Sequence, residues 1–225
     1  MVAGNTTSGT FYVFNKKEQL HPIVFVHGVG LNYEIWQPQL DFFKNYSNLS
    51  YDILGHGKSH LTKQKISFDD FSEQLIELIN ELKIEKIHLI GFSIGSLIAR
   101  NFATRYGDRL QSLILFGSIY KRSEDQQKIV NERFNQAKKE LKLSRLALKR
   151  WFTEKYLENN PDTYEKINSI LSSNNMANFL KIYELFVRHK NDEDFEKIKV
   201  NTLIMTGEYD IGSTIEMSQQ LNNII

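Results

Sequence analysis

The chain has 225 residues, with 28 Lys and Arg against 27 Asp and Glu, and it contains no cysteine. This length suits one domain, or one domain with an insertion, and a net charge of +1 produces no overall field that favours nucleic acid or a membrane surface. Without cysteine the chain has no disulfides, thiolate metal sites or cysteine nucleophiles.

The amino-terminal segment, residues 1–10, is polar and lacks the apolar core of a signal peptide. No apolar run approaches the roughly 20 residues that a membrane helix needs. We therefore expect a cytoplasmic protein whose partner is a small-molecule substrate, with no cofactor, no metal, no nucleic acid and no membrane contact. The sequence leaves the oligomeric state open.

Six segments have the character of β-strands, and several are continuous apolar runs, which is typical of strands covered on both faces of a parallel sheet. In chain order they are Phe11 to Phe14, Pro22 to Val26, Asn48 to Tyr51, Lys86 to Ile90, Gln111 to Phe116 and Val200 to Met205. Helical patterns alternate with them, at Asp69 to Leu82 and at Ser96 to Tyr106. This alternation predicts an α/β fold with a doubly wound, mostly parallel sheet.

Residues 119–198 show helical patterns only. The expected helices are Ser123 to Leu141, Ser144 to Tyr156, Pro161 to Leu171 and Met176 to His189, the third with proline at a favourable first-turn position. We therefore divide the chain into a core formed by residues 1–118 and 199–225 and an all-helical insertion formed by residues 119–198.

One short segment carries the chemistry. Residues 91–95 read Gly-Phe-Ser-Ile-Gly, directly after an apolar run and directly before a helical pattern, with the serine at Ser93. A serine between two glycines at such a junction is the GxSxG nucleophile elbow. The glycines are needed because the chain reverses sharply, and the serine itself adopts a strained backbone conformation. The motif alone can occur by chance, so its position between strand and helix is what favours an exposed, catalytic hydroxyl.

Two further motifs accompany the elbow. The sequence His-Gly-Val-Gly begins at His27 after one strand, and Asp-Ile-Leu-Gly-His-Gly-Lys-Ser begins at Asp52 after the next. With these three motifs the chain, from about Pro22 to its carboxyl end, resembles the α/β-hydrolase superfamily. The resemblance implies an α/β-hydrolase fold in which the helical insertion forms a lid that roofs the elbow and shapes the substrate pocket.

The resemblance also implies roles for particular residues. Ser93 is the expected nucleophile, and the backbone N–H groups of Val29 and Ile94 are the expected donors of the oxyanion hole. Asp210 follows the strand that ends at Met205, where the superfamily carries the acid that orients a catalytic histidine. The alternative for Asp210 is a residue that only caps the following helix.

The histidine of such a triad is missing from its expected place. All six histidines precede Asp210, whereas in the superfamily the histidine follows the acid, after an eighth strand. We therefore expect a chain that is truncated at its carboxyl end and lacks the last strand and helix of the fold. The amino end is also expected to be shortened, because one strand rather than two precedes Pro22.

The histidines that are present have other expected roles. His27 and His56 occupy motif positions that are usually structural in the superfamily, and His88 lies within the strand before the elbow and is expected to be a core residue with its hydrogen bonds satisfied. His189 ends a helix of the insertion and is the one histidine that is a candidate to face the pocket.

The insertion gives a hint about the substrate, because it carries an excess of basic residues between positions 119 and 160. Most of them are expected to solvate helix faces. Arg145 and Arg150 are the candidates to point inward and hold a substrate carboxylate. Residues 149–156 look like the lid of 3-oxoadipate enol-lactonases, and that likeness implies a small lactone that carries a carboxylate.

Together these features favour a serine hydrolase that cleaves a small carboxylic ester or lactone through an acyl-enzyme on Ser93. Trp36 and Phe92 are candidate walls of its substrate pocket, with core packing as the alternative. Carbon–carbon bond hydrolases and cofactor-free haloperoxidases are alternatives on the same fold. A non-catalytic ligand-binding protein or an inactive fragment is the alternative from another class.

Overall fold

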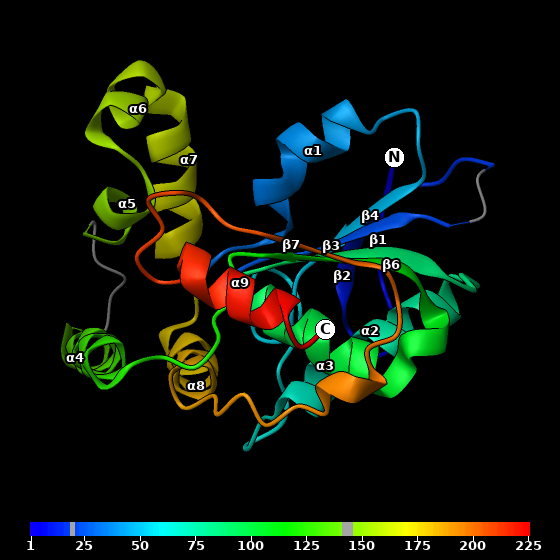
Figure 1. Ribbon diagram of the computed structural model, residues 1–225. Helices are drawn as coiled ribbons and strands as arrows, with labels where there is room; N and C mark the ends of the chain where they lie inside the picture. Colours follow the sequence, from blue (N-terminus) through cyan, green and yellow to red (C-terminus); the bar gives the residue numbers. More distant parts are fainter. Residues whose placement is uncertain (19–20, 141–145) are drawn as a thin grey trace.

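The computed structural model describes residues 1–18, 21–140 and 146–225 (Figure 1). Within these residues seven strands form one sheet in the order β1-β2-β4-β3-β5-β6-β7. The pairs β1–β2 and β2–β4 are antiparallel, and every other pair is parallel. The strands are β1 (Val2–Asn5), β2 (Phe11–Asn15), β3 (Ile23–Val26), β4 (Asn48–Tyr51), β5 (Ile87–Phe92), β6 (Leu110–Phe116) and β7 (Thr202–Met205). The expected α/β fold with a doubly wound, mostly parallel sheet is confirmed.

Helices cover both faces of the sheet, as Figure 1 shows. One face carries α1 (Gln37–Phe42), and the other carries α2 (Phe68–Glu81), α3 (Ile94–Tyr106) and α9 (Ile215–Asn222). The main core lies between the sheet and the pair α2 and α3, where Leu89 of β5, Leu75 of α2 and Ile98 of α3 are fully buried. Burial of such apolar side chains is the dominant favourable term in folding.

Helix α2 illustrates how the sequence determines these elements. Ser67 and Asp70 form a capping box at its start, in which the backbone N–H of Ser67 donates to the Asp70 carboxylate over 2.7 Å. Phe71, Leu75 and Leu78 follow at helical spacing and are fully buried against the sheet. The helix expected from Asp69 to Leu82 is confirmed to within one residue at each end.

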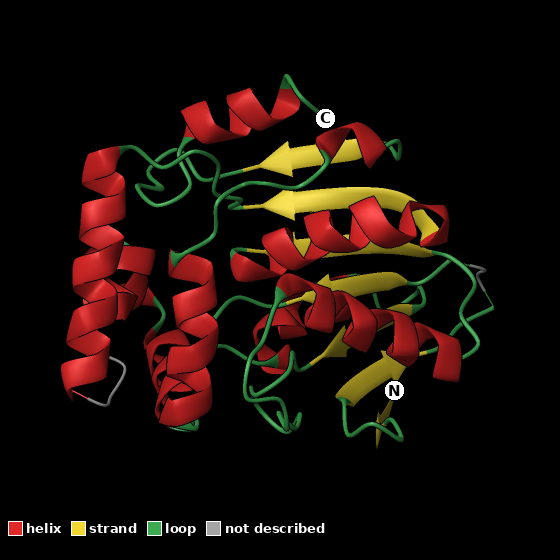
Figure 2. Ribbon diagram, turned by 90° about the horizontal axis from the view of Figure 1, so that it is seen from below, coloured by secondary structure: helices red, strands yellow, loops and turns green. Residues whose placement is uncertain are grey.

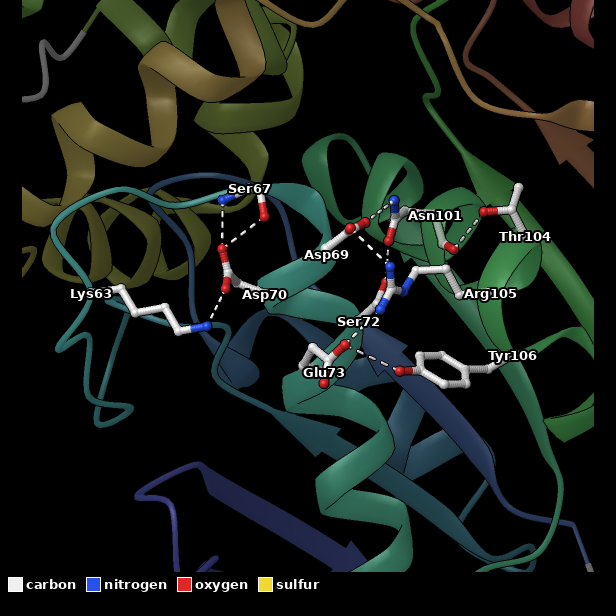
Figure 3. A network of polar contacts seen from close by, with 10 residues as sticks. All are labelled: Lys63, Ser67, Asp69, Asp70, Ser72, Glu73, Asn101, Thr104, Arg105 and Tyr106. Carbon is white, nitrogen blue, oxygen red and sulfur yellow. Dashed lines mark hydrogen bonds and ion pairs between the residues drawn. The ribbon is translucent and has the colours of Figure 1, made fainter.

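Polar contacts join α2 to α3 on their exposed side (Figure 3). Arg105 of α3 forms ion pairs with Asp69 over 2.8 Å and with Glu73 over 2.6 Å, and Asn101 donates to Asp69 over 2.9 Å. Because these groups are partly solvated, each pair contributes at most about 1 kcal/mol. These polar contacts therefore add little to the packing of α3, whose buried side chains contact both α2 and the sheet.

The helical insertion stands at the carboxyl ends of the parallel strands (Figure 2). It consists of α4 (Glu124–Glu140), α5 (Leu146–Trp151), α6 (Glu154–Asn159), α7 (Pro161–Ser172) and α8 (Met176–Val187). The expectation of a single helix from Ser144 to Tyr156 is wrong. The chain breaks after Trp151, and the Thr153 hydroxyl caps α6 by accepting from the N–H of Tyr156 over 3.2 Å.

The amino end also differs from the expectation. Two strands precede Pro22 rather than one, because Val2–Asn5 pairs antiparallel with β2. This strand has no fully buried side chain, so it lacks the apolar alternation by which a strand is recognised. At the opposite side of the sheet β7 is an edge strand, with Leu203 and Met205 exposed. No helix in the described parts of the chain has the length and apolar character needed to cross a membrane.

Candidate active site

The junction between β5 and α3 has the backbone geometry of a nucleophile elbow. Ser93 has φ 56° and ψ −119°, a conformation that is costly for a residue with a side chain. The flanking glycines allow close backbone approach: a Cβ on Gly91 would lie 2.2 Å from the carbonyl oxygen of Gly95, and a Cβ on Gly95 would lie 2.4 Å from that of Val26. The surrounding backbone therefore holds the strained serine in place.

The side chain of Ser93 faces a cavity of about 300 Å³ between the core and the insertion. Its backbone N–H donates to the carbonyl of Phe116 at the end of β6 over 2.9 Å, which fixes the elbow to the neighbouring strand. No described residue hydrogen-bonds the Ser93 hydroxyl, which leaves it available to a substrate or a base. Phe92 also lines this cavity, as expected from the sequence.

Asp210 lines the same cavity, from the loop after β7. One carboxylate oxygen, Oδ1, accepts from the N–H groups of Gly212 and Ser213 over 2.8 and 2.9 Å. The Ser213 hydroxyl donates to the carbonyl of Gly117 over 2.9 Å and so ties this loop to the end of β6. The second oxygen, Oδ2, has no protein partner among the described residues and lies over Gly117, 3.7 Å from where a Cβ would stand. Asp210 is thus held by one oxygen and presents the other.

The two expected oxyanion donors are free within the described residues. Neither the N–H of Val29 nor that of Ile94 donates to a protein acceptor there. Val29 lines the cavity beside Ser93, and Ile94 is the first residue of α3, where N–H groups have no acceptor within the helix. The positive end of the α3 dipole adds favourable potential for an anion at this position.

Two buried histidines shape the loop that carries Val29. His27 Nδ1 donates to the carbonyl of Gly28 over 2.8 Å, and its Nε2 accepts from the N–H of Ile53 over 3.1 Å. His56 Nε2 accepts from the N–H of Gly30 over 2.8 Å. Burial lowers the pKa of His27 to about 3 and that of His56 to about 4, so both rings are neutral at pH 7. These hydrogen bonds agree with the structural role expected for His27 and His56.

None of the six histidines lines the cavity, and all six lie within the part of the chain that the structure describes. His88 is half-buried and hydrogen-bonds the Ser112 hydroxyl over 2.7 Å. His189, the candidate for the pocket, instead lies with its Nε2 3.2 Å from a carboxylate oxygen of Glu193. The chain therefore brings Ser93 and Asp210 to one cavity without a histidine between them.

The other expected pocket residues have different outcomes. Trp36 does not line the cavity: it is buried and packs on Phe25 with ring centroids 5.0 Å apart, beside Leu40 of α1. Trp36 ends the short helical turn Tyr33–Trp36, directly before α1, and its ring belongs to a separate apolar cluster with Phe25 and Leu40. Arg145 lies outside the described residues.

The insertion contributes three arginines and one carboxylate, that of Glu140, to the lining of the cavity. Arg150 of α5 lines the cavity as expected, and so do Arg133 of α4 and Arg122, which the sequence analysis did not single out. Arg122 is used structurally, because it donates to the carbonyls of Phe186 and Val187. Arg133 and Arg150 have no acidic partner among the described residues. Burial and then the charge of Arg133 lower the pKa of Arg150.

Apolar side chains also line the cavity. Phe179, Tyr183 and Phe186 of α8 line the cavity together with Ile119 and Val130. Burial raises the pKa of Tyr183, and the neighbouring arginines oppose that rise. One cavity thus brings together the nucleophile, apolar side chains and arginines.

Comparison with known proteins gives the family. Residues 21–225 match the α/β-hydrolase-fold family. The chain is 30% identical to the (E)-2-((N-methylformamido)methylene)succinate hydrolase of Acinetobacter baylyi, over 89% of this chain and 76% of that protein. It is 24% identical to 3-oxoadipate enol-lactonase 2 of the same organism, over 88% of this chain and 75% of that protein.

Solved structures agree on the fold. The enol-lactonase from Burkholderia xenovorans superposes with a TM-score of 0.83 at 21% identity, over all of this chain and 88% of that one. An esterase from Thermogutta terrifontis with malate bound gives a TM-score of 0.79 at 22% identity, over all of this chain and 86% of that one. The chain therefore belongs to the α/β-hydrolase family, and it is an enzyme of that class.

The close backbone approach at the elbow generates a first prediction. Gly95→Ala places a methyl group 2.4 Å from the carbonyl oxygen of Val26, so part of the elbow must shift, and we expect a loss of about 2 kcal/mol or more in the free energy of unfolding in urea. Gly207→Ala is the matched control, since a Cβ there meets nothing within 4 Å and should change stability by under about 0.5 kcal/mol. Equal stabilities for the two variants would contradict the tight elbow.

Proposed function

We propose that the protein is a serine hydrolase that cleaves a small carboxylic ester or lactone with a negatively charged end. The observation that carries this proposal is the convergence on one cavity of Ser93 in its strained conformation, the free oxygen of Asp210 and the unpaired arginines of the insertion. Residues 119–198 act as the lid in this proposal, and residues 1–118 and 199–225 form the catalytic core.

The geometry suits acyl transfer. The Ser93 hydroxyl attacks the carbonyl carbon of the substrate and forms a tetrahedral intermediate, while a base takes the serine proton. The oxyanion is held by the N–H groups of Val29 and Ile94, and loss of one such donor typically raises the barrier by about 3 kcal/mol. The intermediate then expels the leaving alcohol, which takes up the proton, and water hydrolyses the acyl-enzyme.

The base is the missing part of this mechanism. A serine hydroxyl is a weak nucleophile at pH 7 and needs a base that an acid orients. The free Oδ2 of Asp210 is suited to accept from an imidazole N–H. All six histidines have other positions, so none of them serves as the base in this proposal.

The arginines of the cavity point to the substrate class. A guanidinium group without a counterion in a partly apolar cavity favours a carboxylate ligand, which it can bind through two hydrogen bonds. Two such groups, Arg133 and Arg150, face the same space. The names of these two relatives refer to a succinate derivative and an oxoadipate lactone. By analogy we propose a small, aliphatic, anionic acyl substrate, turned over in the cytoplasm without a cofactor.

Free imidazole tests the nucleophile and its acid. We expect it to occupy the space between Ser93 and Asp210 and to raise the hydrolysis of para-nitrophenyl acetate with a saturable dependence on imidazole concentration. Ser93→Ala should show only the linear, uncatalysed contribution of imidazole, and Asp210→Asn should require a higher imidazole concentration for half-saturation. Equal rates for the wild-type chain and Ser93→Ala at every imidazole concentration would contradict the proposal.

A pair of esters tests the role of these arginines. In the same assay we expect Arg133→Met and Arg150→Met each to raise the KM for para-nitrophenyl succinate about tenfold, because a charge-assisted hydrogen bond to the free carboxylate is lost. The KM for neutral para-nitrophenyl acetate should stay unchanged. Arg188→Met is the control, since Arg188 is an exposed arginine just after α8 that pairs with Glu184 outside the cavity. Loss of activity toward both esters alike would argue against carboxylate recognition by these arginines.

A further inference from the structure

The two chain segments that connect the insertion to the core run side by side against α3. Residues 117–123 lead from β6 into α4, and residues 188–201 lead from α8 to β7. Arg100 of α3 lies between them, seven residues after Ser93, and its side chain is fully buried. A buried guanidinium group needs a specific set of acceptors, so its partners show what it holds together.

Arg100 contacts both connections at once. Its Nη1 donates to the carbonyl of Ile119 over 2.8 Å and lies 3.4 Å from the Ser118 hydroxyl, both in the first connection. Its Nη2 donates to Glu193 over 2.6 Å and lies 3.4 Å from the Asn191 side chain, both in the second connection. One planar group thus ties the two ends of the insertion to each other and to the helix that begins at the elbow.

Charged and aromatic groups surround the Arg100 guanidinium; burial lowers its pKa, and Glu193 opposes that shift. Burial opposes ionisation of Glu193, but its contacts with His189 and Arg100 outweigh burial and lower its pKa. His189 packs edge-on against Phe68 at the start of α2, with ring centroids 5.0 Å apart. The Phe195 ring lies 4.9 Å from the Arg100 guanidinium carbon. None of these five residues lines the cavity that holds Ser93.

We propose that Arg100 is a positioning residue for substrate recognition. It fixes where α4 and α8 stand relative to Ser93, and so sets the distance between the reacting carbonyl and the carboxylate end that Arg133 and Arg150 bind. A buried ion pair is weak evidence for stability, because well-packed apolar residues can replace it at little cost. What an apolar pair cannot replace is the directed link to Ile119 and Asn191. The recognition part of this inference rests on the proposed function.

The test distinguishes loss of the Arg100 contacts from a general loss of folded protein. Arg100→Met alone leaves Glu193 buried without its partner and is expected to destabilise the whole chain. The double variant Arg100→Met/Glu193→Met removes both charges and keeps apolar volume, so it should fold. Arg105→Met is the matched control, because it removes an exposed, paired arginine from the same helix without touching the insertion.

Hydrogen exchange followed by mass spectrometry gives the first readout. In the double variant we expect exchange about tenfold faster than wild type in residues 117–123 and 188–195 and in α4 and α8, with β5 and α3 unchanged. Arg105→Met should leave all these segments as in wild type. Wild-type exchange in both connections of the double variant would overturn the proposal, and so would a uniform acceleration that includes β5 and α3.

Recognition gives the second readout, in the imidazole-supplemented assay. The double variant should raise the KM for para-nitrophenyl succinate about tenfold and leave the kcat and KM for para-nitrophenyl acetate unchanged, a split that loss of folded protein alone would not produce. An unchanged KM for the anionic ester would overturn the positioning role. If wild type turns over neither ester, the proposed function fails, while the exchange pattern still decides whether Arg100 holds the insertion.

Discussion

The site depends on one steric constraint, the close contact between the backbone of the elbow and the strand beside it. Gly95 lies so near the carbonyl of Val26 that no side chain fits between them, and Gly91 lies equally near the carbonyl of Gly95. This contact forces the chain to turn at Ser93 and holds that residue in a conformation that it would not adopt alone. The hydroxyl is therefore directed into the cavity by the backbone rather than by side-chain hydrogen bonds.

The parallel sheet supplies the other groups of the site at the same end. Strands β3, β5, β6 and β7 run in one direction, so the loops that follow them meet beside Ser93. Val29 comes from the first of these loops, Gly117 from the third and Asp210 from the fourth. Hydrogen bonds from Ser93 to Phe116 and from Ser213 to Gly117 then join neighbouring loops. The insertion adds what the sheet cannot provide, a cationic and partly apolar roof.

How much of this could be predicted from the sequence follows from how local each signal is. The elbow, the His27 loop and the Asp210 loop follow apolar strands and depend on glycine and proton-acceptor positions within a few residues, so sequence alone located them. The strand Val2–Asn5 was not predicted, because its side chains are largely exposed and only its pairing with β2 defines it. The break between α5 and α6 was missed because residues 144–156 were interpreted as one continuous helix, whereas the Thr153 hydroxyl caps α6 in the structure.

The remaining differences concern tertiary placement. Arg133 could not be distinguished from the other basic residues of α4 without knowing which side of that helix faces the cavity. Trp36 has the residue type of a pocket wall but packs on Phe25. Arg100 carries no motif at all, and only the meeting of two distant connections at its guanidinium group reveals what it does.

A crystal structure of the protein soaked with a phenylboronic acid examines the central claim most directly, since boron bonds to a nucleophilic serine as a mimic of the tetrahedral intermediate. The account predicts a bond from boron to the Ser93 hydroxyl oxygen, with a boronate oxygen within hydrogen-bond distance of the N–H groups of Val29 and Ile94. A Ser93 side chain turned into the core, or those two N–H groups bonded to protein acceptors, would contradict it.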